Sequence, residues 1–216
     1  MYRAPSPPVI FELAGIGVEL DYSFFGGAGP DRLDRLRAID AHLSAAENPR
    51  EWHLPSAAIA ALQSIEERKL TREIFLGEWC DPRDLMLIRR GSGDVEGLGR
   101  VSDIRYDTLG EAKVRNWGVA IPDPGFDEPG QYAYAFSSPP YSLNALRSEI
   151  QRLFKQSTEL LLGRGAPIEI FDWSGGDLTL VHPLFEAGME WWGVFLFTIF
   201  NPDDRTMVVI SGSTTD

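Results

Sequence analysis

The stretch "WWGVFLFTIFNPDDRTMVVISGS", residues 191–213, decides the fold of this chain. The twelve residues from Trp191 to Pro202 carry no charge, and five of them are aromatic. The run is too short to span a bilayer, which needs about 20 apolar residues. Its β-branched and aromatic bias favours a strand over a helix, and "TMVVI" (206–210) is a matching second strand. The "NPDDR" between them is typical of a five-residue hairpin loop.

Alternate side chains of the first strand form two faces, and both faces are apolar. One face holds Trp191, Gly193, Phe195, Phe197 and Ile199, and the other holds Trp192, Val194, Leu196, Thr198 and Phe200. A strand of this kind is typical of the centre of a sheet that is covered on both sides. We therefore expect six residues of the hairpin in the core: Val194, Phe195, Leu196, Phe197, Val208 and Ile210.

Hydrophobic periodicity places the other elements around this hairpin. Helices are expected from an N-cap at Asp31 to about Glu47, from Ser56 to about Leu70, and from Ser142 to Gly163. Tyr141 and Leu146 are spaced as a hydrophobic staple for the last of these. Further strands are expected at 9–20, 84–90, 112–121, 131–136 and 167–173, and loops at 91–99 and 122–130.

The chain shows neither an internal repeat nor a linker long enough to divide it. We expect a single α+β domain over residues 9–216, with a mainly antiparallel sheet packed against about three helices. Residues 1–8, "MYRAPSPP", are expected to form a flexible, Pro-rich N-terminal arm.

The net charge of -12 bears on the choice of partner. An acidic protein repels phosphates and anionic lipid, so neither nucleic acid nor a membrane surface is an expected partner. A basic protein would be attracted. Cys80 is the single cysteine and the N-terminus is a poor secretory signal, so a cytoplasmic location is expected. The sequence carries no indication of an oligomeric state.

One segment collects the residue types that catalysis needs. The stretch "FDWSGGDLTLVHPLFEAGMEW" (171–191) contains Asp172, Asp177, His182 and Glu186. Carboxylates with a neutral imidazole could work as an acid/base pair or hold a divalent metal. The spacing matches no metal signature, so no metal or cofactor is predicted. The alternative is a polar loop in which the aspartates make turn hydrogen bonds.

No other catalytic motif is complete in the sequence. "GSGDVEGLG" lacks the Lys-Ser/Thr ending of a P-loop, and the chain has no Gly-x-Ser-x-Gly elbow. Cys80 would need a nearby histidine to act as a nucleophile, and a lone cysteine is more often a small buried hydrophobe.

The six tryptophans allow two interpretations. Large core residues are one interpretation, and exposed platforms for a sugar or a peptide are the other. Trp117 precedes an acidic loop that contains Asp123, Asp127 and Glu128. These four residues are the predicted contacts for a basic partner.

The C-terminus carries a resemblance to a group of known proteins. Its features are Glu190-Trp191-Trp192-Gly193, Thr198, Asn201-Pro202 and Ser213-Thr214-Thr215-Asp216. These roughly thirty residues resemble the ending of small uncharacterised bacterial cytoplasmic proteins, some of which are encoded among toxin-immunity clusters. The resemblance implies a bacterial protein whose role is binding.

The sequence therefore favours a non-enzymatic protein-interaction module, immunity-like in type. The first alternative is a hydrolase or a small-ligand or metal-binding protein built on the cluster around His182. The second is a carbohydrate-binding module that uses exposed tryptophans.

Overall fold

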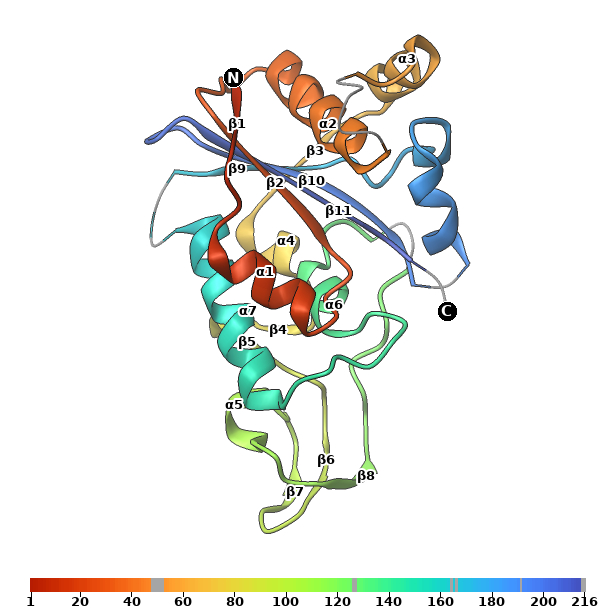
Figure 1. The fold of residues 1–216 in the computed structure, drawn as a ribbon. Helices are drawn as coiled ribbons and strands as arrows, with labels where there is room; N and C mark the ends of the chain where they lie inside the picture. The colour runs from red at the N-terminus through yellow and green to blue at the C-terminus, as the bar shows by residue number, and fades with distance from the viewer. Residues whose placement is uncertain (48–52, 126–127, 164, 166, 191, 215–216) are drawn as a thin grey trace.

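A computed structural model of the chain describes residues 1–47, 53–125, 128–163, 165, 167–190 and 192–214. Its centre is a six-stranded sheet in which every neighbouring pair of strands is antiparallel (Figure 1). In spatial order the strands are β1 (Tyr2–Ala4), β2 (Asp21–Gly26), β11 (Thr206–Ser213), β10 (Val194–Asn201), β9 (Glu169–Asp172) and β3 (Arg68–Leu70).

The β10–β11 hairpin forms the middle of this sheet, as the sequence predicts. The two strands pair along their whole length, from Val194 opposite Ser213 to Asn201 opposite Thr206. Five of the six predicted core residues are buried, and the sixth, Val194, is partly buried. The two faces of the hairpin belong to two separate hydrophobic clusters, which confirms that both are covered.

Helices cover the two faces of the sheet (Figure 1). Leu196 and Met207 lie on one face of the sheet, which we call the α2 face, and belong to one hydrophobic cluster. Phe197 and Ile210 lie on the other face, which we call the α7 face, and belong to the second cluster. The α2 face carries α2 (Arg32–Glu47), α3 (Ser56–Ser64) and the 3-10 segments η1 (Leu178–Leu180) and η2 (Pro183–Met189); the α7 face carries α1 (Pro8–Gly15), α4 (Arg72–Leu76), α6 (Tyr132–Ser137) and α7 (Arg147–Leu162).

Two small sheets extend the structure beyond the α7 face, and the three-stranded one lies at the end opposite the main sheet in Figure 1. One is the hairpin of β4 (Cys80–Asp81) and β5 (Asp84–Ile88). The other has the order β7 (Gly99–Val101), β6 (Gly93–Val95), β8 (Val114–Trp117), next to the short helix α5 (Tyr106–Leu109).

The α+β class and the mainly antiparallel sheet are confirmed, and the expected number of helices is wrong. The described part of the chain holds seven α-helices rather than about three, most of them only one or two turns long. Short helices lack the repeated apolar spacing by which a sequence reveals a helix. The predicted N-terminal arm also needs correction, because Tyr2–Ala4 pairs with β2 as an edge strand.

Two predicted strands are helices. Within residues 9–20 the chain forms α1, whose first residue is Pro8, a position where the fixed φ of proline suits a helix. Residues 131–136 mostly form α6, which follows Gln131 in the left-handed region at φ 69°. All six residues of α6 are buried, so no polar face marks its period, and its aromatic residues imitate the composition of a strand.

Several boundaries also shift. The long helix begins at Arg147 rather than after Ser142, and Tyr141 and Leu146 are exposed rather than packed as a staple. Helix α3 ends at Ser64, before β3, and β6 lies inside the predicted loop 91–99.

Gly193 changes the expected facing of Trp192. Its φ of 125° breaks the alternation of side chains just before β10 begins. The ring of Trp192 therefore packs edge-on against Phe195, with ring centroids 5.1 Å apart, and not with Leu196 as a regular strand would require.

No helix in the described part of the chain is long and apolar enough to cross a membrane.

Replacing Phe197 with alanine should destabilise the fold strongly. The side chain is fully buried in the hairpin and packs edge-on against Phe75, with ring centroids 5.2 Å apart. We expect a loss of about 3–5 kcal/mol in the free energy of unfolding, measured by urea titration. The control Val119→Ala removes a side chain that is 81% exposed and should change it by less than about 0.5 kcal/mol. A similar small effect for both variants would contradict the central position of Phe197.

Candidate functional site

The predicted catalytic residues do not converge on a metal-type site. Asp172 is buried at the end of β9, where its carboxylate accepts hydrogen bonds from the backbone N–H groups of Gly130 (2.9 Å) and Ser174 (2.8 Å). His182 is also buried, and its Nδ1 accepts a hydrogen bond from the N–H of Leu184 at the start of η2. Both side chains hold backbone in place.

The other two members of that set lie on the surface. Asp177 is exposed and accepts a hydrogen bond from the Thr179 hydroxyl, and Glu186 is exposed in η2. Among the described residues no group of three or more His, Cys, Asp or Glu side chains is arranged to hold a metal ion. An enzyme built on these four residues therefore stays a prediction, and their arrangement gives it no support.

The predicted binding residues divide between two places. Trp117 is half-exposed in the edge strand β8 of the small three-stranded sheet. Asp123 and Glu128 are exposed on the segment between β8 and α6, and Asp127 lies outside the described residues. Of these residues, Glu128 borders a groove.

This groove has a volume of about 500 Å³, within the range of ligand-binding clefts. It lies between the helix α4, the β4–β5 hairpin and the segment that leads into α6. Its apolar lining comes from Ile74, Pro82, Leu85 and Pro129, and Ile74 is 46% exposed. An exposed apolar lining of this kind is typical of a surface that another molecule covers.

Three carboxylates surround the apolar lining: Glu73, Glu78 and Glu128. All three are exposed, and none forms an ion pair within the described part of the chain. Hydrogen bonds with its own backbone and with the Thr71 side chain lower the pKa of Glu73, so this carboxylate is ionised at neutral pH. The groove therefore combines an apolar lining with three carboxylates, which outnumber the one arginine of the lining, Arg89.

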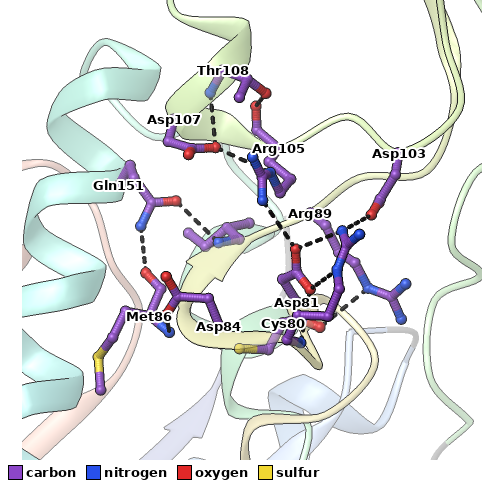
Figure 2. A network of polar contacts seen from close by, with 12 residues as sticks. Cys80, Asp81, Asp84, Met86, Arg89, Asp103, Arg105, Asp107, Thr108 and Gln151 are labelled. Atoms are coloured by element: carbon purple, nitrogen blue, oxygen red, sulfur yellow. Dashed lines mark hydrogen bonds and ion pairs between the residues drawn. The ribbon is translucent and has the colours of Figure 1, made fainter.

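A buried carboxylate holds one wall of the groove (Figure 2). Asp81 is fully buried at the turn of the β4–β5 hairpin. It accepts hydrogen bonds from the Nε and Nη2 of Arg83 and from its backbone N–H, all near 3.0 Å, and a longer one from Arg105. Arg83 also pairs with Asp103. These contacts with arginine keep the pKa of Asp81 well below its usual range.

The same wall is held from two other sides. The Gln151 side-chain amide, from α7, accepts from the N–H of Ile88 (3.0 Å) and donates to the carbonyl of Met86 (2.6 Å). It takes the place of a neighbouring strand along β5. Arg89 donates from Nε to the carbonyl of Cys80 (Figure 2) and to that of Glu78, which joins β5 to the segment before it.

The opposite wall depends on Gly130. Its φ is 81°, and a Cβ at this position would lie 2.0 Å from the carbonyl oxygen of Ile74. Only glycine allows the segment after Glu128 to approach α4 this closely. The hydrogen bond from Gly130 to Asp172 holds it there, so the carboxylate of Asp172 positions the groove.

Cys80 lines the groove, but its thiol has a structural role and not a catalytic one. The thiol is buried and donates to the carbonyl of Leu85. Burial, followed by the nearby charges of Asp81 and Asp84, raises its pKa to about 12. A thiol with this pKa is not a nucleophile at neutral pH.

The tryptophans of the described residues do not form a stacking platform for a sugar. Trp79, Trp173 and Trp192 are buried, whereas Trp117 is half-exposed. Trp79 is covered by Arg90 and by Tyr134, whose pKa is raised to about 12 by burial, with a contribution from Asp123.

Sequence reasoning missed Glu73 and Glu78 because one is a single acidic residue in a short helix and the other lies in the turn that follows it. The available sequence signal was an apolar residue, Ile74, directly after the acidic Glu73; only the structure shows that Ile74 is exposed. Its meaning depends on Glu128, which is about fifty residues away in sequence.

No known protein-family model, curated protein or solved structure matches this chain.

Asp81→Asn should lower the free energy of unfolding by about 1–3 kcal/mol, because it leaves charged donors without a charged acceptor. The folded-state pKa of Asp81 lies below the unfolded value near 4, so its stabilisation is present above that pH and is lost as the pH falls. The difference between wild type and Asp81→Asn, measured by urea titration at several pH values, should therefore shrink below about pH 4.

The control for this experiment is Asp103→Asn. Asp103 is 33% exposed and contacts the exposed Arg83, so its effect should stay below about 1 kcal/mol. Equal effects at Asp81 and Asp103, or a difference that grows in acid, would contradict the assigned role.

Proposed function

We propose that this chain is a non-enzymatic protein-interaction module that binds a basic, partly apolar segment of another protein in the groove between α4 and the β4–β5 hairpin. The observation that carries the proposal is the combination of an exposed apolar lining with Glu73, Glu78 and Glu128 around it. Apolar contacts supply affinity at such a site, while the surrounding charges select the partner and speed its approach.

The remainder of the molecule supports a binding role. The net charge of -12 attracts a basic partner over distances of about a Debye length. The walls of the groove are held by buried hydrogen bonds at Asp81, Gln151 and Asp172, so the site is formed before binding. A preformed site avoids the entropy loss of ordering loops on association.

The resemblance of the C-terminal thirty residues supports a more specific form of the proposal. The resemblance implies a bacterial protein whose role is binding. In this chain a basic toxin surface would be the partner, and the groove would contact an arginine or lysine next to an apolar side chain.

The test is a titration of the labelled protein with a short synthetic peptide of arginine and leucine, followed by NMR. The largest shifts should fall on residues around Glu73, Glu78 and Gln131, and affinity should fall as salt is raised. The variant Glu73→Gln/Glu78→Gln/Glu128→Gln should weaken binding about tenfold or more, since three charges are removed at the contact.

The matched control is Glu19→Gln/Glu66→Gln/Glu186→Gln, which changes the net charge equally at exposed positions outside the groove. It should retain most of the affinity. If both triple variants lose affinity equally, or if the shifts spread over the whole surface, the attraction is a general charge effect and the groove is not the binding site.

A further inference from the structure

A second cavity lies on the α2 face of the sheet, away from the groove. Its volume is about 350 Å³, which suits a small molecule. It is bordered by the edge strand β1, by β2 and β11, and by α2. Its polar lining comes from Arg3, Asp21, Ser23, His42 and Ser211, which belong to four different elements.

The buried part of this lining is a continuous hydrogen-bonded chain. His42 Nδ1 lies 2.7 Å from the hydroxyl of Ser23, and Nε2 lies 2.8 Å from the hydroxyl of Ser211. Arg3 donates to the same Ser23 hydroxyl at 3.0 Å. His42, Ser23 and Ser211 are each less than a tenth exposed.

The sheet register explains this meeting. Ser23 lies opposite Val209, and Ser211 lies two residues further along β11, so both serines are on the α2 face. His42 comes down onto that face from α2.

A count of the hydrogens shows that one hydroxyl hydrogen in this hydrogen-bonded network has no acceptor. Burial, followed by the charges of Arg3 and His182, lowers the pKa of His42 to about 3, so at neutral pH the ring carries one N–H. The ring and the two serines hold three hydrogens, and the two bonds to His42 use two. In either tautomer one serine hydroxyl keeps a hydrogen for which the described residues provide no acceptor.

Two opposite charges complete the lining. Arg3 and Asp21 are both exposed, and neither forms an ion pair, with the other or elsewhere, among the described residues. Partial burial of the Asp21 carboxylate raises its pKa, and no contact with Arg3 offsets this shift. The two charges are therefore available to separate groups of one ligand.

We infer that this cavity binds a small zwitterion with a carboxylate and an ammonium group, such as a free amino acid. Arg3 and the spare serine hydroxyl receive the carboxylate, because guanidinium groups pair well with carboxylates. Asp21 receives the ammonium group. The inference does not depend on the proposed groove, which lies on the α7 side of the sheet.

The same residues do not favour nucleophilic catalysis by Ser23. A general base needs a partner that stabilises its protonated form, and the group on the far side of His42 is a neutral serine hydroxyl. The positive charge of the Arg3 guanidinium also disfavours an imidazolium ion.

The test is a thermal-shift and calorimetry series with the twenty free amino acids on the full chain. At about 10 mM ligand, a site with a Kd of about 1 mM should raise the melting temperature by about 2–4 °C. At least one free amino acid should do so, while its N-acetyl form and its amide should bind at least about tenfold more weakly.

Variants then locate the binding. Arg3→Gln and Asp21→Asn should each reduce affinity about tenfold or more without changing the melting temperature of the free protein by more than a few degrees, since both residues are exposed. Arg115→Gln and Asp203→Asn are the matched controls at exposed positions outside the cavity and should bind like wild type.

Three results would overturn the inference. The first is that no free amino acid shifts the melting temperature. The second is that the N-acetyl form binds as well as the free amino acid, which would exclude the role of Asp21. The third is binding that survives both cavity variants, which would place the ligand elsewhere.

Discussion

The burial of the β10–β11 hairpin on both faces is the constraint on which the rest of the structure depends. Both strands carry large apolar side chains on each side, and exposing either side to water would cost about 25 cal/mol for each Å² of apolar surface. The chain therefore has to supply two covering layers. It does so with α2, α3, η1 and η2 on one face and with α1, α4, α6 and α7 on the other.

Each layer leaves a binding feature where its packing ends. On the α7 face, α4 and α6 pack through Phe75 and Tyr132, and the surface beyond them is the acid-lined groove. On the α2 face, the apolar packing that includes Leu43 and Val209 ends at the hydrogen bonds between His42 and Ser23. Both sites lie next to the core, so their backbone walls and buried side chains are positioned before any ligand arrives.

Buried polar groups in this protein mainly hold backbone. Asp81 and Asp172 each accept hydrogen bonds from more than one donor, and Gln151 pairs with one backbone N–H and one backbone carbonyl; each lies behind a wall of the groove. Asp172 and His182 drew attention in the sequence as possible catalytic groups. Their hydrogen bonds show why residue type alone is a weak guide, since a carboxylate that accepts two backbone N–H groups has the same sequence appearance as a catalytic acid.

The sequence by itself determined the central hairpin, the two apolar faces of β10, the α+β class and the acidic balance, because each depends on local composition and on a period of two. It also placed α2 and most of α7, whose apolar spacing repeats over four turns. The short helices α1 and α6 were not predictable: α6 is buried on all sides, and α1 has about two turns with one buried residue, Leu13, so neither shows a repeated apolar period. Only the tertiary structure decided which distant residues meet: Glu73 with Glu128, and Arg3 and Ser23 with His42 and Ser211. Those meetings follow from sheet order and helix packing, which depend on contacts between residues far apart in the chain.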